Sequence, residues 1–162
     1  MQGDARVIYR LQAQLKNELT AINQYFLHYR MYQHWGLAKL AKKECHESIG
    51  EMKHADKLMD RILMLVLMLD ALPNLQHLGK LMIVEDVPEA LGCDLKAEQE
   101  AQATLNEGTA HCESVPNFVS RELPQGILDD TDEHIDSLET QLALVQKVGF
   151  QYCLHSQMGA LD

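Results

Sequence analysis

The sequence predicts an all-α protein, a four-helix bundle with a long crossover between its second and third helices and a short fifth C-terminal helix. Along four long segments, residues suited to burial recur at alternating steps of three and four, as the inner face of a helix requires. The segment from Leu72 to Val87 has no helical period, and a bundle whose second and third helices run parallel needs a long connection there. The chain of 162 residues, 1–162, is long enough for one domain with its own core.

The first helix is expected to begin after Asp4, a suitable N-cap, and to end at Trp35-Gly36, with Gly36 as the C-cap. Glu18 lies on its buried face, and a carboxylate among apolar side chains is costly unless something compensates it. Pairing with a buried arginine, or a place at the rim, would explain Glu18 taken alone. The face consists of Ile8, Leu11, Leu15, Glu18, Ile22, Tyr25 and Tyr29.

The second helix is expected to stop near Pro73-Asn74. Three carboxylates and an imidazole stand in a row on its inner face, and a merely solvated face would not become apolar again at Leu58. Glu51 and His54, three residues apart, lie about one turn from each other and can bind one metal ion from the same side. Taken alone, His54 is more typical of a buried core histidine. The face consists of Leu40, Glu44, Glu47, Glu51, His54 and Leu58.

The third helix is expected to start at Asp86, an N-cap before Pro88, and the fourth close to Pro116. Within the fourth helix, Leu123-Pro124-Gln125-Gly126 predicts a kink or a later start. Gly149 should cap this helix, and Phe150 to Met158 should form the fifth. The inner faces are Leu91, Asp94, Glu98, Ala101, Leu105 and Cys112 on the third helix and Ile127, Thr131, His134, Leu138 and Val145 on the fourth.

The two halves of the chain repeat one spacing. In each half a Glu is followed 36 residues later by a His. The position 33 residues after that Glu is Glu51 in the first half and Thr131 in the second. Di-iron carboxylate four-helix bundles have this ligand plan, in which two helices each give a Glu and two each give Glu-x-x-His. Thr131 stands where the plan has a fourth carboxylate. The two sets are Glu18, Glu51 and His54, and Glu98, Thr131 and His134.

Composition narrows the class of partner. The formal net charge is −10, with 24 acidic residues against 14 Lys and Arg, which argues against nucleic acid and is compatible with cations. The apolar run from Ile62 to Leu69 is far shorter than the roughly 20 residues that span a bilayer, so no membrane partner is expected. No signal peptide or paired cysteine motif is evident, and reduced thiols in a cytoplasmic protein are expected for Cys45, Cys93, Cys112 and Cys153.

Four stretches carry a resemblance to a known family: Asn17 to His28, Glu47 to Asp56, Leu72-Pro-Asn-Leu-Gln, and His134-Ile-Asp with Leu138-Glu-Thr-Gln-Leu142. On these stretches the chain resembles the bacterioferritins over nearly its whole length. The resemblance implies a ferritin-like subunit of a hollow 24-subunit cage, which oxidises Fe(II) and stores it as ferric mineral. It also implies a haem b shared between two subunits, and it leaves open whether the cage contains one kind of subunit or two.

The resemblance also assigns residues. Glu18, Glu51, His54, Glu98 and His134 match the di-iron ligands. Met52 matches the haem-ligating methionine, and His46 matches a position linked to iron passage, where Gly50 replaces a carboxylate. Three departures stand out: Thr131 replaces a bridging Glu, the run Val66 to Asp70 looks about four residues longer than usual, and Pro124 and Gly126 replace good helix formers.

The number of carboxylates at the expected site predicts how its metal binding differs from that of the family. Two Fe(II) ions bring four positive charges, and with Thr131 in place the site has three carboxylates, so the half-site of Glu98 and His134 should be the weaker one. Asp130, four residues before His134, is a candidate substitute ligand. Tyr25 either lies beside the metals or is a core aromatic with a hydrogen-bonded hydroxyl. Met52 should point outward, about 100° around the helix from the neighbouring ligand.

Three functions are compatible with these observations. The leading hypothesis is an iron-storage subunit with ferroxidase activity. The second is a structural or haem-carrying cage subunit with an impaired metal site, which Thr131 favours. The third, a small di-metal oxidase or peroxidase that forms no cage, fits less well because the resemblance extends through the short final segment.

Overall fold

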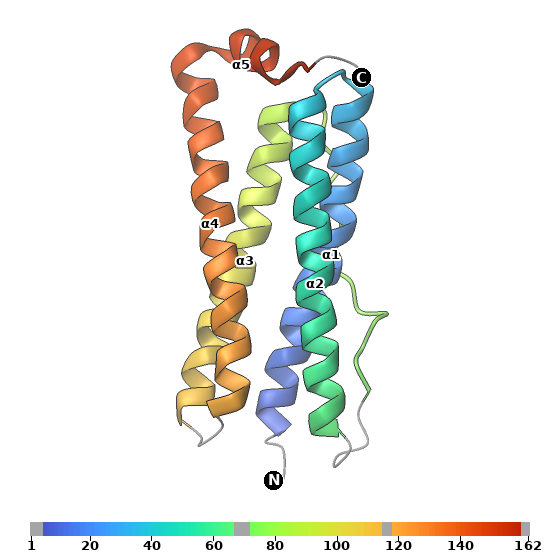
Figure 1. Ribbon diagram of the computed structural model, residues 1–162, viewed down its shortest axis with the longest axis vertical. Coiled ribbons are helices and arrows are strands. Elements are labelled where there is room, and N and C mark those ends of the chain that lie inside the picture. The colour runs from blue at the N-terminus through green and yellow to red at the C-terminus, as the bar shows by residue number, and fades with distance from the viewer. Residues whose placement is uncertain (1–4, 67–71, 115–117, 160–162) are drawn as a thin grey trace.

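The computed structural model describes residues 5–66, 72–114 and 118–159, with the side chains of 66 and 118–120 left aside. These residues form helices and no strand, so the predicted fold class is confirmed. Four long helices lie side by side and the fifth crosses one end of the bundle (Figure 1). The helices are α1 (Ala5–His34), α2 (Ala38–Val66), α3 (Val87–Ser114), α4 (Phe118–Val148) and α5 (Phe150–Gln157).

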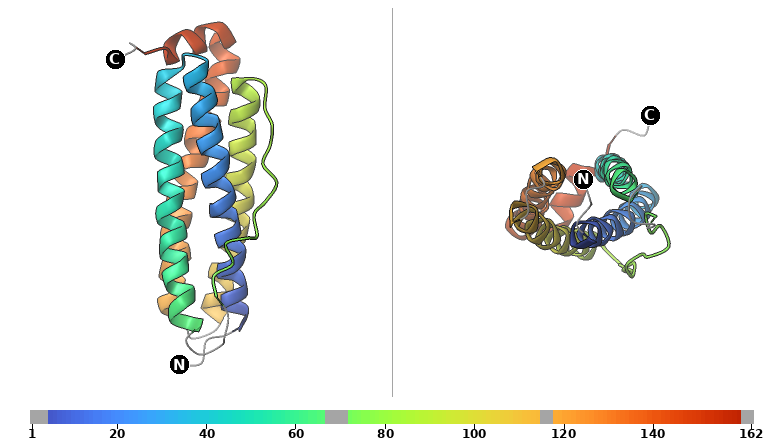
Figure 2. Two further views of the ribbon diagram at one scale, coloured as in Figure 1. Left: turned by 90° about the vertical axis from the view of Figure 1, so that its right-hand side faces the viewer. Right: turned by 90° about the horizontal axis from the view of Figure 1, so that it is seen from below.

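The order of the helices follows the predicted topology. In Figure 1, α1 rises from the N-terminal end, α2 and α3 both descend, and α4 rises again to meet α5. The crossover that this parallel pair requires runs along the outside of the bundle beside α1 (Figure 2). Within the described residues, no helix is both long and apolar enough to span a lipid bilayer.

The predicted caps end the helices as expected. Gly36 takes a φ of 78°, which glycine adopts without strain, and the Leu37 N–H donates to the Tyr32 carbonyl at 2.9 Å. Gly149 takes a φ of 86° after α4. Asp86 caps α3, since its Oδ1 accepts the Glu89 N–H at 2.9 Å. The predicted N-cap of α1, at position 4, lies outside the described residues.

The crossover is held to α1 by polar side chains. Thr20 Oγ1 accepts the Gly79 N–H and Gln24 Oε1 accepts the Met82 N–H, both at 2.7 Å. The described part of α2 ends at Val66, and residues 72–74 are already non-helical. The end of α2 expected near Pro73-Asn74 therefore falls before 72, and the longer run expected after Val66 lies outside the described residues.

Helix α4 starts at Phe118 and continues through Pro124, so the later start that was one of two expected outcomes is wrong. Proline removes one backbone hydrogen bond from the helix. Apolar burial on both sides offsets this loss, because Leu123 packs against the core and Ile127 is 1% exposed. A bend at Pro124 stays a prediction.

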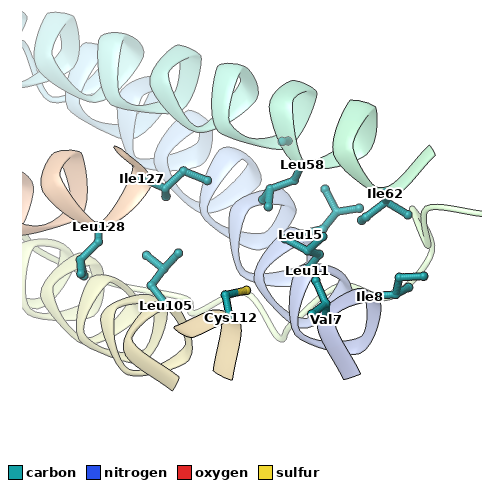
Figure 3. Packing of buried hydrophobic residues seen from close by; sticks show 11 residues of the cluster. Val7, Ile8, Leu11, Leu15, Leu58, Ile62, Leu105, Cys112, Ile127 and Leu128 are labelled. Carbon is teal, nitrogen blue, oxygen red and sulfur yellow. The ribbon is translucent and has the colours of Figure 1, made fainter. Parts of the chain in front are cut away.

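The apolar core is divided into two clusters with polar side chains between them. On α3, Leu91 belongs to the cluster near α5 and Leu105 to the cluster at the opposite end, with Glu98 between them. Helix α2 shows the same order, with Leu40 and Leu58 on either side of its carboxylates. Figure 3 shows the cluster at the far end, which includes Val7, Ile8, Leu11, Leu15, Leu58, Ile62, Leu105, Cys112, Ile127 and Leu128. The fold therefore places its buried charges at mid-bundle.

Candidate metal centre

The five residues predicted as di-iron ligands all lie buried inside the bundle. Glu18 comes from α1, Glu51 and His54 from α2, Glu98 from α3 and His134 from α4. Each is between 2% and 8% exposed. Buried carboxylates are rare unless something of opposite charge compensates them.

The five residues form two groups that share Glu51. Glu18, Glu51 and His54 each offer one ligand atom, and these atoms lie within 4.8 Å of one another. Glu51, Glu98 and His134 form a second such group. Glu51 is thus placed to bridge two ions, each with one further carboxylate and one imidazole. Both imidazoles turn Nδ1 toward the carboxylates, with His54 Nδ1 3.1 Å from Glu51 and His134 Nδ1 2.9 Å from Glu98.

Tyr25 lies against the second group. Its hydroxyl donates a hydrogen bond to Glu98 Oε1, and its ring meets His134 edge-on, with centroids 5.4 Å apart. Burial and the nearby Glu98 carboxylate raise the pKa of Tyr25 well above its usual value, so the phenol keeps its proton. The expected core aromatic with a hydrogen-bonded hydroxyl is therefore confirmed, and a place beside bound metals stays a prediction.

The first group holds protons when no ion is bound. Burial, with the Glu18 carboxylate beside it, raises the pKa of Glu51 to about 8. Burial opposes the charged form of His54, but the Glu18 and Glu51 carboxylates outweigh it and raise the His54 pKa to about 11. The pKa of His134 is raised too, because hydrogen bonding to Glu98 outweighs burial. A cluster that retains protons in this way is electrostatically suited to cations.

Glu47 is a functional candidate that sequence reasoning missed. Thr131 is buried at 5% exposed and brings no negative charge to the second group. Glu47 Oε2 lies 4.0 Å from His134 Nδ1, the nitrogen that faces Glu98, and its side chain is 30% exposed. The signal was present in the sequence, since Glu47 stands one turn before Glu51 on the same face of α2.

Asp130 lies at the first group and not at the second, where it was expected as a substitute ligand. Its Oδ2 is 2.9 Å from His54 Nε2, on the far side of the imidazole from Glu51. The side chain is 62% exposed. Carboxylates in this position commonly orient a metal-binding imidazole without touching the metal.

The centre opens to the surface through a cleft of about 350 Å³ between α2 and α4. Four carboxylates line it, which favours cations over anions. Gly50 also lines the cleft, whereas the exposed His46 is not among its lining residues, so a role for His46 in iron passage stays a prediction. The cleft is lined by Glu47, Gly50, Glu51, His54, Asp130, Glu133, His134 and Ser137.

Met52 points outward, as predicted, and is 47% exposed. Ile49, three residues earlier on the same side of α2, is 40% exposed, and Phe26 on α1 is 53% exposed. The Ser48 hydroxyl donates to the Ile22 carbonyl at 2.9 Å and joins α1 and α2 at this level. An outward thioether, with an exposed isoleucine one turn away, is a side chain that could ligate a haem iron.

Comparisons with known proteins agree with the fold. Residues 8–148 match the ferritin-like domain. The bacterioferritin of Rhodobacter capsulatus is 46% identical over 151 residues, covering 93% of this chain and 91% of that protein. That of Brucella melitensis is 46% identical over 149 residues, 92% and 90% of the two chains. Bacterioferritin BfrA of Mycobacterium tuberculosis is 44% identical over 149 residues, 92% and 91%. The chain therefore belongs to the bacterioferritin family of ferritin-like proteins.

Proposed function

We propose that this protein is an iron-storage subunit that oxidises Fe(II) at a paired metal site inside its helix bundle. One observation carries the proposal: two groups of buried ligands, each with a carboxylate and an imidazole of its own, share Glu51. Carboxylates and imidazoles are the ligands that iron prefers when thiolates are absent. The five residues would act both as the metal ligands and as the catalytic site.

Two Fe(II) ions bound as a pair can together supply the two electrons that reduce one molecule of oxidant. Each ion gives one electron, so dioxygen that accepts two electrons and two protons leaves as hydrogen peroxide. Hydrogen peroxide as the oxidant would leave as two water molecules. The protein supplies the spacing through Glu51, while Tyr25 orients Glu98 through its hydroxyl proton. The acidic cleft between α2 and α4 admits the Fe(II) substrate.

The charge deficit left by Thr131 makes the second half-site the weaker one. Glu18, Glu51 and Glu98 offset three of the four charges of two Fe(II) ions. We infer that Glu47 supplies the fourth, since it lies 4.0 Å from His134 Nδ1 and opens onto the same cleft. Its partial exposure weakens its attraction relative to that of a fully buried carboxylate.

Haem binding and assembly belong to the same proposal. A haem held by Met52 from each of two subunits would supply a one-electron redox centre on their symmetry axis. Exposed apolar side chains on the crossover and α5, among them Leu72, Ile83 and Tyr152, are 74%, 85% and 78% exposed and support burial in an assembly. A cytoplasmic cage of 24 copies, or one shared with a second kind of subunit, would bury them.

A second candidate function is a structural or haem-carrying cage subunit whose metal site is impaired. Thr131 is the observation that favours it, because a buried hydroxyl replaces a charge in the second half-site. Both candidates predict a cage of the same mass. They differ in whether the bundle itself accelerates iron oxidation.

Stopped-flow oxidation of Fe(II) distinguishes the two candidates. The unaltered protein should rapidly oxidise two Fe(II) per chain, whereas His54→Ala should be at least about tenfold slower. His155→Ala, which removes an exposed histidine on α5, is the matched control and should behave like the unaltered protein. Equal, slow oxidation by all three proteins would favour the impaired subunit.

A further inference from the structure

A second cluster of metal-ligand side chains lies outside the centre described above. His28 on α1 and Cys93 and Asp94 on α3 each offer one ligand atom, and these atoms lie within 4.8 Å of one another. We propose that these three side chains form a third metal site, which takes a borderline divalent ion such as Zn²⁺. This site goes beyond the proposed function and does not depend on it.

The geometry already brings two of the ligands together. His28 Nδ1 lies 2.9 Å from Asp94 Oδ1 and 3.1 Å from Oδ2, and both residues are fully buried. The His28 N–H is aligned with Oδ2, so the buried Oδ1 accepts no hydrogen bond although the same nitrogen lies close to it. A buried carboxylate oxygen without a donor leaves one acceptor position that a cation can satisfy.

The donor set selects the kind of ion. A thiolate, an imidazole and a carboxylate suit Zn²⁺, which binds sulfur, nitrogen and oxygen ligands with tetrahedral geometry. Three protein ligands leave the fourth position open for water. The paired centre lacks sulfur, so an ion bound to Cys93 is chemically distinguishable from ions bound to Glu51 or its neighbours.

Ion binding would rearrange two protons. Burial and the adjacent Asp94 raise the pKa of the Cys93 thiol to about 11, with Lys96 opposing them, so the thiol holds its proton until an ion displaces it. Binding at His28 Nδ1 moves the imidazole proton to Nε2, which lies 2.9 Å from Gln24 Nε2. Turning the Gln24 amide would present its oxygen there, at the expense of its hydrogen bond from the Met82 N–H and of the one it donates to the Met82 carbonyl. The hydrogen bond between His28 and Asp94 and the two between Gln24 and Met82 are thus exchanged for three metal–ligand bonds.

The proposed third site lies between a pocket on the protein surface and the paired metal centre. Cys93 is half-buried and lines a surface pocket of about 360 Å³ that α1, α3 and the crossover enclose. Asp94 precedes Glu98 by four residues, so the third ion would lie about one helical turn from the second half-site. Lys16, Lys80 and Lys96 line the same pocket, and their charge should make entry of the ion slow.

Cobalt binding to the assembled, chelator-treated protein tests the site, because Co²⁺ bound to thiolate absorbs in the near ultraviolet. With long equilibration, the unaltered protein should develop this band to a limit of one thiolate per chain. Cys93→Ser should lose the band, whereas Cys45→Ser, which removes another half-buried thiol, should keep it. Weaker visible bands from cobalt at the paired centre should survive in Cys93→Ser, so each site is judged separately.

Absence of the thiolate band in the unaltered protein, or its survival in Cys93→Ser, would overturn the proposal. Alkylation supplies a second measurement that needs no variant. Zn²⁺ should slow the modification of Cys93 by iodoacetamide, mapped by mass spectrometry, by about tenfold or more, because the bound thiolate is blocked. Equal rates with and without Zn²⁺ would also overturn it.

Discussion

Asp130 and His54 meet across the gap between α4 and α2, with Asp130 Oδ2 2.9 Å from His54 Nε2. On the other side of the ring, Nδ1 lies 3.1 Å from Glu51 Oε2. Asp130 therefore holds the imidazole proton on Nε2 and leaves Nδ1 to face the ion. The relationship assigns Asp130 to the orientation of a ligand.

Removing this orientation should weaken the first half-site without abolishing it. We expect Asp130→Ala to lower the affinity for the first Fe(II) by about 10-fold to 100-fold, while two ions still bind per chain at saturation. Anaerobic Fe(II) titration measures both quantities. Asp129→Ala removes a neighbouring exposed carboxylate and should change neither. Loss of one bound ion in Asp130→Ala would show that Asp130 is itself a ligand.

The missing fourth carboxylate predicts a gain of function. Thr131→Glu should tighten the second Fe(II) by about tenfold or more, because it restores a buried negative charge beside His134. Thr131→Gln, of similar size and no charge, is the control for packing. Stopped-flow oxidation should be faster in the Glu variant than in the Gln variant. Equal rates would indicate that charge does not limit the second half-site.

The compensating role of Glu47 can be tested by comparing Glu47→Gln in the unaltered protein and in the Thr131→Glu variant. In the unaltered protein, Glu47→Gln should weaken the second Fe(II), since it removes the substitute charge near His134. In Thr131→Glu the same change should have a smaller effect, because the charge has been restored. Glu133→Gln, which lines the same cleft, should be near neutral in both backgrounds. Equal effects of Glu47→Gln in the two backgrounds would contradict the compensation.

The raised pKa values predict proton release on metal binding. A pH of 7 is below the pKa of Glu51, about 8, and below that of His54, about 11. In the ion-free protein both groups therefore carry a proton that the ion must displace. Metal affinity should therefore fall as the pH falls, and proton release should decrease above pH 8 as Glu51 ionises. Zn²⁺ calorimetry of Cys93→Ser, which lacks the thiol proton of the third site, counts the protons when it is repeated in buffers of different ionisation heat. Zero release at pH 7 would contradict this description.

Two glycines should respond to alanine in opposite directions. Gly126 lies inside α4, and nothing lies within 4 Å of the position that an added Cβ would take, so Gly126→Ala should stabilise by about 0.5–1 kcal/mol. Gly149 has a φ of 86°, so Gly149→Ala should destabilise by about 1 kcal/mol. Thermal unfolding of the assembled protein measures both. A lower midpoint for Gly126→Ala would show that an interface occupies that space.

The sequence predicted the parts of the fold that depend on local pattern. Steps of three and four identified each buried face, and the capping residues Asp86, Gly36 and Gly149 end or begin helices where expected. The start of α4 was less predictable, because the cost of Pro124 is local whereas the burial of Ile127 that offsets it depends on the whole bundle.

The site was predictable where two spacings agreed and unpredictable where contacts join distant helices. The repeated interval of 36 residues identified His54 and His134 because both halves of the bundle share one geometry. The buried pair of His28 and Asp94 has no comparable repeat. The direction of Asp130 depends on how far α4 is rotated against α2, which spacing along one helix does not determine.

The central claim is that two metal ions bind within the bundle and share Glu51. Crystals soaked anaerobically in Fe(II) and measured at the iron absorption edge test this directly. The anomalous map should show two peaks per chain, about 3.5–4 Å apart, on either side of the Glu51 carboxylate. A map with no iron between the helices, or with iron only on the outer surface, would contradict the claim.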